Sequence, residues 1–460
     1  MKGSGRMMSA AACVLGAAAV CGAQERDKAG DAAGASGAAG ALSASSAAGA
    51  SSAASAASAA STAGAAAGHD SGGFFLRSVD EAFELRVRGQ VQLRYAASLR
   101  NDDDGDGDGT SEDSFESGFE TRRTKLFLDG HVRSKRLTYQ VAGAFGRVTG
   151  EANLEYAWMA YRWESGLRVL AGQFKQPLLR EWLVSSSLQL AAERTLVNEA
   201  FNGGYVQGVQ LDRTLGPVKL TASFHDGSRS QSTEPGAEKV TTSQGLLTRA
   251  AGAGESDYGV TGRAEWLLGG EWGALRDFTS PAGAGLTAMA GAAVNFEGGG
   301  AGSSEFAAGD YRAVTWTADL SLEGDGWNGF AAVVGSHADY EDLTASLGGV
   351  AAGGDLATDD YGFVVQGGYV LPGTDWEVFA RYEATLAEGS RPGSNPGGVF
   401  DAVTAGVNYY MYGHASKFTA DVLVQLDRLN PLVGGRPASG TLGDDDETEV
   451  SLRLQWQLLF

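Results

Sequence analysis

The last eleven residues, Val450 to Phe460, read VSLRLQWQLLF and decide the fold. Apolar residues occupy every second position, polar residues fill the gaps, and Leu459 alone breaks the alternation. A period of two places the apolar set on one face of a β-strand and the polar set on the other. An exposed terminal strand of this kind is an aggregation hazard in a soluble sheet. A closed barrel in a membrane removes the free edge and gives the apolar face a lipid solvent.

The same alternation continues through the chain from Phe74 onward. In residues 84–96, Arg86, Arg88 and Arg94 share one face of the expected strand while aliphatic residues share the other. This arrangement suits a wall between lipid and a water-filled lumen. The pattern predicts sixteen strands, at 84–97, 119–132, 135–147, 153–164, 167–176, 204–214, 217–226, 257–268, 284–296, 310–323, 327–341, 359–371, 375–388, 399–412, 415–428 and 447–460.

The connections between these segments alternate between long and short. Most short ones are tight turns such as Gly324-Asp325-Gly326, but 148–152 is short for the long side and 269–283 is long for the short side. Alternating loop lengths and an even strand count predict an all-β fold, a closed antiparallel transmembrane barrel of sixteen strands. No stretch beyond residue 70 approaches the ~20 apolar residues of a membrane-spanning helix.

The N-terminal part of the chain differs from the rest in composition. Residues 1–23 have basic residues, a short apolar run and small residues at Cys21-Gly22-Ala23, which predicts a secretory signal peptide. Lipidation at Cys21 is the alternative. Residues 24–73 are rich in Ala, Ser and Gly and predict a disordered spacer, followed by the barrel at 74–460. Both cysteines precede the expected cleavage after Ala23, so the mature chain has no thiol.

Charge and motif searches narrow the function classes. The net charge of −21 argues against a nucleic-acid partner. The acidic run at 102–113 resembles the start of a calcium loop, but Phe115 occupies the position of the closing Glu, so a solvated loop is favoured over loose divalent-cation binding. Asp444 to Glu447 is interpreted in the same way. The five histidines are isolated, and no nucleophile elbow or phosphate-binding loop occurs, so we expect no metal, no cofactor and no enzyme.

Four stretches in the first half of the barrel carry a family resemblance. They read FETRRTKLFLDG (119–130), LRVLAGQFKQPL (167–178), SSSLQLAAERTL (185–196) and AFNGGYVQGVQL (200–211). Their order resembles the phosphate-selective porin family (porins O and P) of Gram-negative outer membranes. The resemblance implies a homotrimer of sixteen-stranded barrels, each with a loop folded into its pore. Gln176 is a departure, since the family usually has Glu in this region.

The connection 177–203 is too long and apolar for a simple exposed loop. We expect this third long loop to constrict the lumen, where Glu181, Glu193 and Glu199 meet the wall together with Arg194; a surface helix against a neighbouring subunit is the alternative. The alternation along each strand predicts that several Arg and Lys side chains point into the lumen, where they would line a pathway for anions. Arg122 is expected at the rim or on a bulge. The alternative is that inward cations and acids pair and only hold the barrel's shape. The wall cations are Arg86, Arg88, Arg94, Arg122, Arg123, Lys125, Lys175, Arg263 and Arg381.

The sequence thus predicts an outer-membrane porin for passive diffusion of small hydrophilic solutes, with a preference for anions of the phosphate type. A non-specific or sugar-type diffusion porin is one alternative, and a structural barrel tethered by the N-terminal spacer is another. The expected partners are small anionic or polar solutes, outer-membrane lipid and lipopolysaccharide. The last strand, ending in Phe460, resembles the terminal signal of bacterial outer-membrane barrels and is expected to engage the barrel-assembly machinery.

Overall fold

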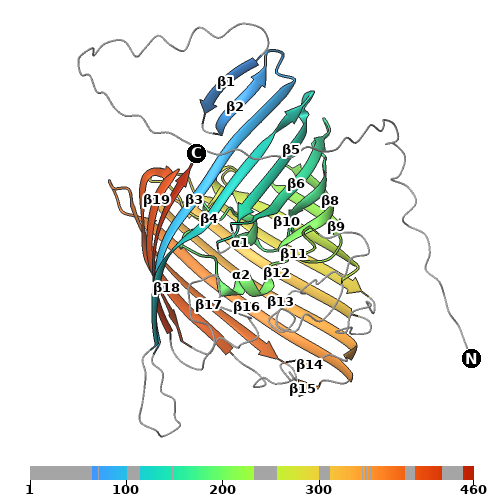
Figure 1. Cartoon of the computed structure of the whole chain (residues 1–460), viewed down its shortest axis with the longest axis vertical. Coiled ribbons are helices and arrows are strands. Elements are labelled where there is room, and N and C mark those ends of the chain that lie inside the picture. Colours follow the sequence, from blue (N-terminus) through green and yellow to red (C-terminus); the bar gives the residue numbers. More distant parts are fainter. Residues whose placement is uncertain are drawn as a thin grey trace, which may run out of the picture. The chain divides into compact units, whose positions relative to one another are not determined.

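The computed structural model describes most of the chain from residue 65 onward (Figure 1). The predicted signal peptide, both cysteines, most of the predicted spacer and the acidic runs at 102–113 and 444–447 lie outside the described residues. The described ranges are 65–70, 72–100, 114–147, 150–232, 256–299, 311–343, 346–347, 350–351, 354–388, 399–426 and 449–460.

A single antiparallel sheet closes on itself to form the barrel. The sheet has eighteen strands, of which β1 and β2 lie outside the ring, leaving sixteen in the barrel wall. The ring closes where β20 pairs with β3, from Leu459 opposite Gln90 to Glu449 opposite Arg100. The wall strands are β3 (Phe83–Arg100), β4 (Ser114–Val132), β5 (Ser134–Phe145), β6 (Ala152–Arg162), β7 (Arg168–Lys175), β8 (Tyr205–Leu215), β9 (Val218–His225), β10 (Tyr258–Gly269), β11 (Thr287–Gly299), β12 (Tyr311–Gly324), β13 (Trp327–Leu343), β16 (Gly354–Val370), β17 (Trp376–Glu388), β18 (Val399–His414), β19 (Ser416–Gln425) and β20 (Glu449–Leu459).

Each of the sixteen predicted segments corresponds to one wall strand, so the predicted fold class is confirmed. The largest differences are at the ends next to the long connections, where β4 and β16 begin five residues earlier than predicted. At these ends the hydrogen-bond ladder continues beyond the residues in which apolar and polar side chains alternate clearly. A small hairpin of β14 (Ser346–Leu347) and β15 (Val350–Ala351) lies within the predicted long connection 342–358.

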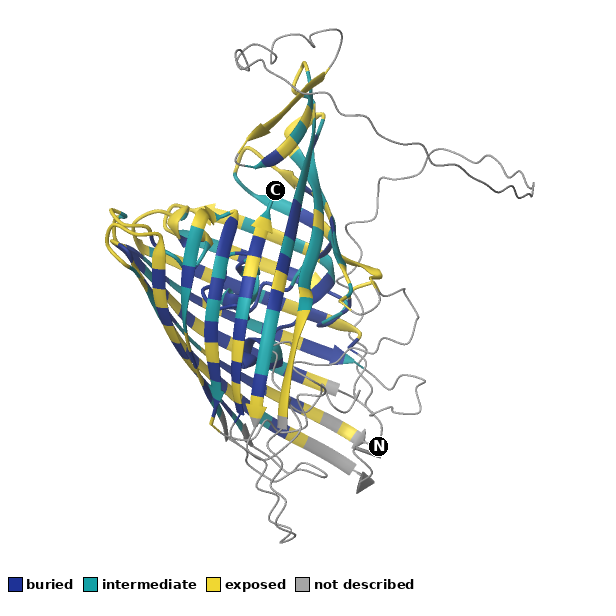
Figure 2. Ribbon diagram, turned by 60° about the vertical axis from the view of Figure 1, so that its left-hand side comes forward, coloured by how far each residue is buried: buried dark blue, intermediate teal, exposed yellow. Residues whose placement is uncertain are grey.

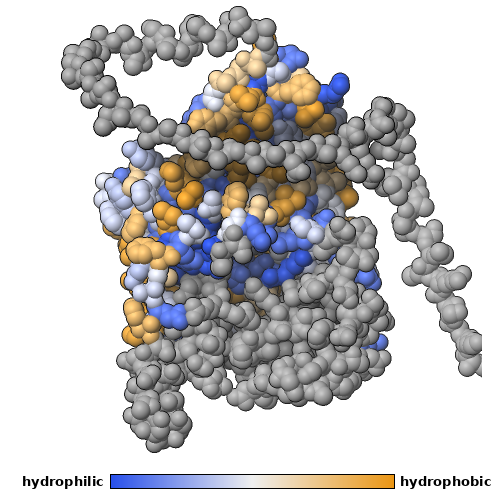
Figure 3. Space-filling view, viewed as in Figure 1, coloured by the Kyte–Doolittle hydropathy of each residue, from blue (hydrophilic) through white to orange (hydrophobic). Residues whose placement is uncertain are grey.

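The wall has an apolar outside and a polar inside. Along the strands, buried and exposed residues alternate (Figure 2). Outward residues such as Phe224 and Trp266 are more than half exposed, whereas inward residues such as Gln92, Thr261 and Arg453 are buried. The surface over β3 to β6 is largely apolar (Figure 3). This inverted distribution needs lipid around the barrel.

None of the helices within the described ranges is long and apolar enough to cross a bilayer.

An N-terminal hairpin extends the sheet beyond the seam of the barrel. Phe460 exchanges backbone hydrogen bonds with Gly89, and β2 (Gly73–Ser78) then continues along the same edge of β3, with Phe74 opposite Val87. β1 (Ala65–Asp70) pairs with β2. The sequence placed residues 65–70 in the disordered spacer, but they form a strand because β2, paired with β3 beyond Phe460, offers its own unpaired edge.

Candidate functional site

The connection between β7 and β8, residues 176–204, lies inside the ring of strands. It contains two short helices, α1 (Arg180–Leu183) and α2 (Leu196–Phe201), seen among the strands in Figure 1. Leu178, Leu190 and Phe201 are almost completely buried and pack with inward residues such as Val334 and Phe379. The apolar side chains that made this loop unsuited to water are therefore buried against one side of the lumen.

Polar side chains of β17 to β19 hold the backbone of this loop. Asp421 accepts a hydrogen bond from the Ala192 amide at 2.9 Å, and Glu383 accepts bonds from the Leu196 and Val197 amides at 2.5 and 3.2 Å. Because Leu196 begins α2, the Glu383 carboxylate satisfies amides that have no partner within the helix. Lys417 and Asn408 donate to the Gln189 and Leu190 carbonyls at 2.7 and 2.9 Å. This side of the wall therefore uses its carboxylates to anchor the loop.

Further along the same side of the ring, on β3 and β4, three arginines converge on Glu193 of the loop. Arg94 and Arg123 contact its two carboxylate oxygens at 2.7 and 2.5 Å, and Arg122 contacts both. Arg122 and Arg123 both point inward because the β3–β4 register shifts between Gln92 and Leu93, which leaves Arg122 as an extra residue. Burial opposes the charge of Glu193, but the arginines outweigh it and hold its pKa well below the ordinary value.

A second irregularity, in β6, brings Glu155 and Tyr156 inward together. The β5–β6 register shifts between Ala142 and Gly143, and Glu155 accepts two hydrogen bonds from Lys125, at 2.6 and 2.7 Å. Lys125, predicted to face the pathway, is therefore paired with a carboxylate, Glu155, that was not among the predicted site residues. An adjacent-residue pair on one face is invisible to a strict period-two analysis.

Lys175 and Arg194 meet around Trp182 of α1. Each cation lies 4.9 Å from the centre of the indole ring, a cation–π distance. Lys175 donates to the Trp182 carbonyl at 2.6 Å, and Arg194 donates to the Glu181 and Val184 carbonyls at 3.1 and 2.7 Å. Both cations thus fix the fold of the loop.

The remaining predicted site residues lie at several separate places. Arg263 pairs with Asp319 at 2.8 Å, and Arg381 donates to the Glu193 carbonyl at 2.8 Å. Arg88 pairs with Asp129, whereas Arg86 pairs with Asp70 and Glu84 at the N-terminal hairpin. Glu181 accepts bonds from the Thr195 amide and hydroxyl within the loop. Glu199 is partly exposed on α2, and its backbone carbonyl accepts a bond from Arg229.

Two connected cavities lie along the inner face of β3 to β10. They have volumes of 420 and 340 Å³ and share Gln140, Trp158, Arg162 and Arg168 in their linings. Nine cationic and four carboxylate side chains line these two cavities. Arg213 is not counted, because it faces outward in the alternation of β8. The nine are Arg86, Arg88, Lys135, Arg136, Arg162, Arg168, Lys175, Lys219 and Arg263.

Five of these cations were missing from the predicted site: Lys135, Arg136, Arg162, Arg168 and Lys219. Each lies within three residues of a tight turn, at Arg133, Glu164-Ser165-Gly166 or Gly216. A count of basic residues beside the short turns would have found them.

A second connection also folds inward, from the side of the short turns. Residues 270–286 follow β10 and include the short 3-10 helix η1 (Ala274–Arg276), whose Leu275 carbonyl accepts a bond from Arg180 of α1. Phe278 packs on Phe330 with ring centres 4.9 Å apart. The connection at 270–286 is unusually long for this side of the barrel because it packs inward. It fills the lumen beneath the loop at 176–204.

Comparisons with known proteins agree with this architecture. The family model described as phosphate-selective porin O and P matches residues 91–256. The outer membrane channel DcaP of Acinetobacter baumannii is 15% identical with a TM-score of 0.51, over 83% of this chain and 99% of that chain. OmpT folded in vitro, an outer membrane protein of Vibrio cholerae, is 11% identical with a TM-score of 0.51, over 82% and 98%. No curated protein sequence is a significant match.

At these identities the two solved structures show the fold alone, while the family model covers β4 to β9 and the loop with its arginine contacts. The barrel fold and the family match indicate a channel rather than an enzyme. The chain thus has the β-barrel fold of the outer membrane channel DcaP, and its residues 91–256 match the family model of the phosphate-selective porins O and P.

Proposed function

We propose that this porin passes small hydrophilic solutes passively and prefers anions of the phosphate type over cations. The observation that carries the proposal is the unequal division of charge inside the barrel. Along β3 to β10, cations outnumber carboxylates nine to four in the described cavity linings. The chain as a whole has a net charge of −21, so this excess of positive charge is local.

The loop at 176–204 covers a part of the wall whose buried carboxylates lie beside the buried cations Arg381, Lys417 and Arg453. Asp421, Glu383 and Glu377 are at most 1% exposed, and the first two bind backbone amides of the loop. Asp421 also pairs with Arg453 at 2.6 Å and Glu383 with Arg381 at 3.5 Å, so these negative charges are neutralised within the wall. The solute therefore meets mainly the basic wall.

Seven of the nine wall cations have a carboxylate partner, and the proposal depends on Arg162 and Lys175, which have none among the described residues. Arg168 pairs with Asp212 at 3.0 Å and Lys219 with Glu265 at 2.7 Å. Such pairs are what the alternative predicts, in which the inward charges only hold the barrel's shape. Arg162 instead donates to the Gly166 carbonyl, so its positive charge is not neutralised by that bond. Guanidinium groups match the oxygens of phosphate in pairs, and rings of Arg and Lys select anions.

The assembly and domain predictions are part of the same proposal. The barrel assembles as a homotrimer, residues 1–23 are removed on export, and the Ala-rich residues that follow act as a spacer. The loop at 176–204 sets the width of the pathway. The barrel-assembly machinery recognises the last strand, which ends in Phe460. Lipopolysaccharide and phospholipid surround the apolar outside.

Reversal potentials across planar bilayers in a potassium chloride gradient test the selectivity. We expect a potential of the sign for chloride preference, and inhibition of the chloride current by added phosphate. A cation-selective potential would overturn the anion proposal, and anion preference without inhibition would indicate a non-specific porin. Absence of conductance in a folded barrel would favour the structural, tethered barrel.

Matched variants assign the preference to the basic wall. Arg168→Gln removes a cation from both cavities and should lower the chloride-to-potassium permeability ratio about twofold, the order expected for one of several weakly screened charges. Arg123→Ala and Lys175→Ala should also lower it. Arg133→Gln, in the β4–β5 turn, is the control of equal charge. Equal potentials for all four variants would contradict the role of the wall.

A further inference from the structure

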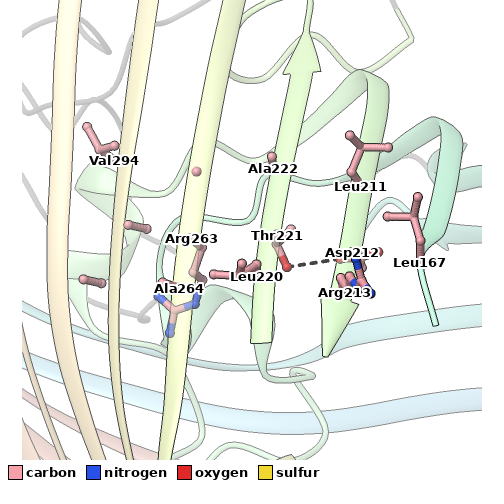
Figure 4. A pocket seen from close by; sticks show the side chains of 13 residues that line it. Leu167, Leu211, Asp212, Arg213, Leu220, Thr221, Ala222, Arg263, Ala264 and Val294 are labelled. Atoms are coloured by element: carbon pink, nitrogen blue, oxygen red, sulfur yellow. Dashed lines mark hydrogen bonds between the residues drawn. The ribbon is translucent and has the colours of Figure 1, made fainter. Parts of the chain in front are cut away.

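The outside of the barrel has a hollow over β8 to β11 that is separate from the lumen. It has a volume of 600 Å³, and Figure 4 shows the side chains around it. Its outward-facing lining is apolar apart from one arginine, while Asp212, Thr221 and Arg263 belong to the inner face of the same strands. The outward members are Leu211, Arg213, Leu220, Ala222, Gly262 and Ala264, with Ala292 and Val294 beside them.

Strand register explains why the wall is hollow here. Gly262 lies opposite Ala222 on one side and Val294 on the other, and Ala264 lies opposite Leu220 and Ala292. The next outward row contains Phe224 and Phe296, which are 60% and 50% exposed. Small side chains thus form a floor between rows of large ones.

Arg213 lies at one end of the hollow. It is exposed in β8, opposite Leu220 and three residues before Gly216 of a tight turn, on the side of the short, periplasmic turns. No hydrogen bond or ion pair of its side chain occurs in the part of the chain that the structure describes. The neighbouring carboxylate, Asp212, faces inward and pairs with Arg168. Arg213 therefore presents an unneutralised guanidinium to the surrounding membrane.

We propose that the hollow binds one acyl chain of a phospholipid from the periplasmic leaflet, with the phosphate of its headgroup against Arg213. A cation on the lipid-facing wall is unfavourable unless it reaches the headgroup region, where phosphate oxygens match its paired donors. The small-residue floor runs from Arg213 toward the middle of the strands, which is the direction that an acyl chain takes from its headgroup. The volume is within the range of ~300–1,000 Å³ of ligand sites. The inference does not depend on the selectivity of the pore.

Native mass spectrometry of protein released from nanodiscs tests the site. The nanodiscs contain phosphatidylcholine with a minority of phosphatidylglycerol, and retained lipids are counted per barrel at increasing collision energy. We expect one phospholipid to remain after the others dissociate. Gly262→Leu with Ala264→Leu fills the floor, Arg213→Gln removes the charge, and each should lower the retained fraction at least fivefold.

Two variants serve as controls. Ala405→Leu enlarges an outward alanine of β18, and Arg133→Gln removes a cation from a turn; both should retain the lipid. Heat-dependent mobility in gels verifies that every variant folds. Equal lipid retention in all variants would overturn the proposal. The proposal would also be overturned if Gly262→Leu with Ala264→Leu abolished a larger oligomer but kept the lipid. The hollow would then be a contact with a second barrel.

Discussion

At the scale of single residues, the bulge at Arg122 decides the chemistry next to the loop. A regular strand would point Arg122 and Arg123 to opposite faces, but the extra residue turns both toward Glu193. Removing the shared carboxylate leaves Arg122 and Arg123, both largely buried, without their ion-pair partner, while Arg94 keeps Glu120. Breaking a buried ion pair from one side costs about 3–5 kcal/mol.

Glu193→Gln should therefore loosen the loop and make the pore more anion-selective. The reversal potential in a salt gradient should shift further toward the chloride value, and the open-channel current should become noisier as the loop moves. Glu181→Gln removes an equal charge whose partners, the Thr195 amide and hydroxyl, belong to the loop itself. A shift no larger than that of Glu181→Gln would count against the arginine contacts as the cause.

At the scale of elements, α2 depends on the space left by Gly362 of β16. A Cβ atom at Gly362 would lie 2.7 Å from Val197 and 3.0 Å from Phe201, both on α2. Gly362→Val should push the helix off the wall at a cost of about 1–3 kcal/mol, the usual penalty of overpacking. We expect a changed single-channel conductance and a lower temperature for loss of heat-resistant gel mobility.

The matched control for this variant is Gly329→Val on β13, where an added Cβ meets nothing within 4 Å. It should leave conductance and thermal stability near those of the parent. If Gly329→Val and Gly362→Val behave alike, the effect belongs to valine in a strand and not to the position of α2.

The N-terminal hairpin is a second element, and its stability should depend on pH. Asp70 accepts hydrogen bonds from Arg86 at 2.6 and 3.0 Å, and this contact lowers the Asp70 pKa from 3.8 to about 2. Because the folded pKa is depressed, the stabilisation is fully present above pH 3.8 and disappears as the pH falls through about 2.

Hydrogen exchange of the β2 amides should therefore accelerate below about pH 3, and Asp70→Asn should accelerate it at neutral pH, since the charged pair is lost. Glu164→Gln, which removes another exposed periplasmic carboxylate that pairs with Arg136, should not change exchange in β2. Exchange in Asp70→Asn equal to that of the parent at pH 7 would show that backbone pairing alone holds the hairpin.

At the scale of the whole molecule, closure of the ring depends on a contact between the last residue and the first wall strand. The ring of Phe460 covers Gly89, so that an added Cβ at Gly89 would lie 2.2 Å from its Cζ. Gly89→Ala should displace the ring from the seam and lower the fraction that folds, measured as the heat-modifiable gel species. In a Phe460→Ala background the same change should have little further effect, because the clash is gone.

Gly118→Ala is the control, because a Cβ there has no neighbour within 4 Å. Additive losses in the Gly89 and Phe460 variants would mean that the two residues act separately, and the seam would then depend on backbone pairing alone.

The sequence by itself determined the barrel, because a period of two and alternating loop lengths are local features that each strand carries. It also placed Arg94, Arg123 and Lys125 on the inner face, because alternation fixes the face of every residue in a regular strand. It left open whether Arg122 lies at the rim or on a bulge and did not identify Glu155, because bulges break that alternation without a distinct sequence pattern.

Only the tertiary structure decided which charges meet. The contact of Glu193 with Arg94 joins residues 99 positions apart, and the anchoring of Ala192 on Asp421 joins residues 229 apart. Such pairs depend on the curvature of the closed ring and on the path of the loop across it, and neither is encoded in the spacing of residues along one strand. The wall covered by the loop, the cation-lined cavities along β3 to β10 and the lipid-facing hollow all arise from that closure.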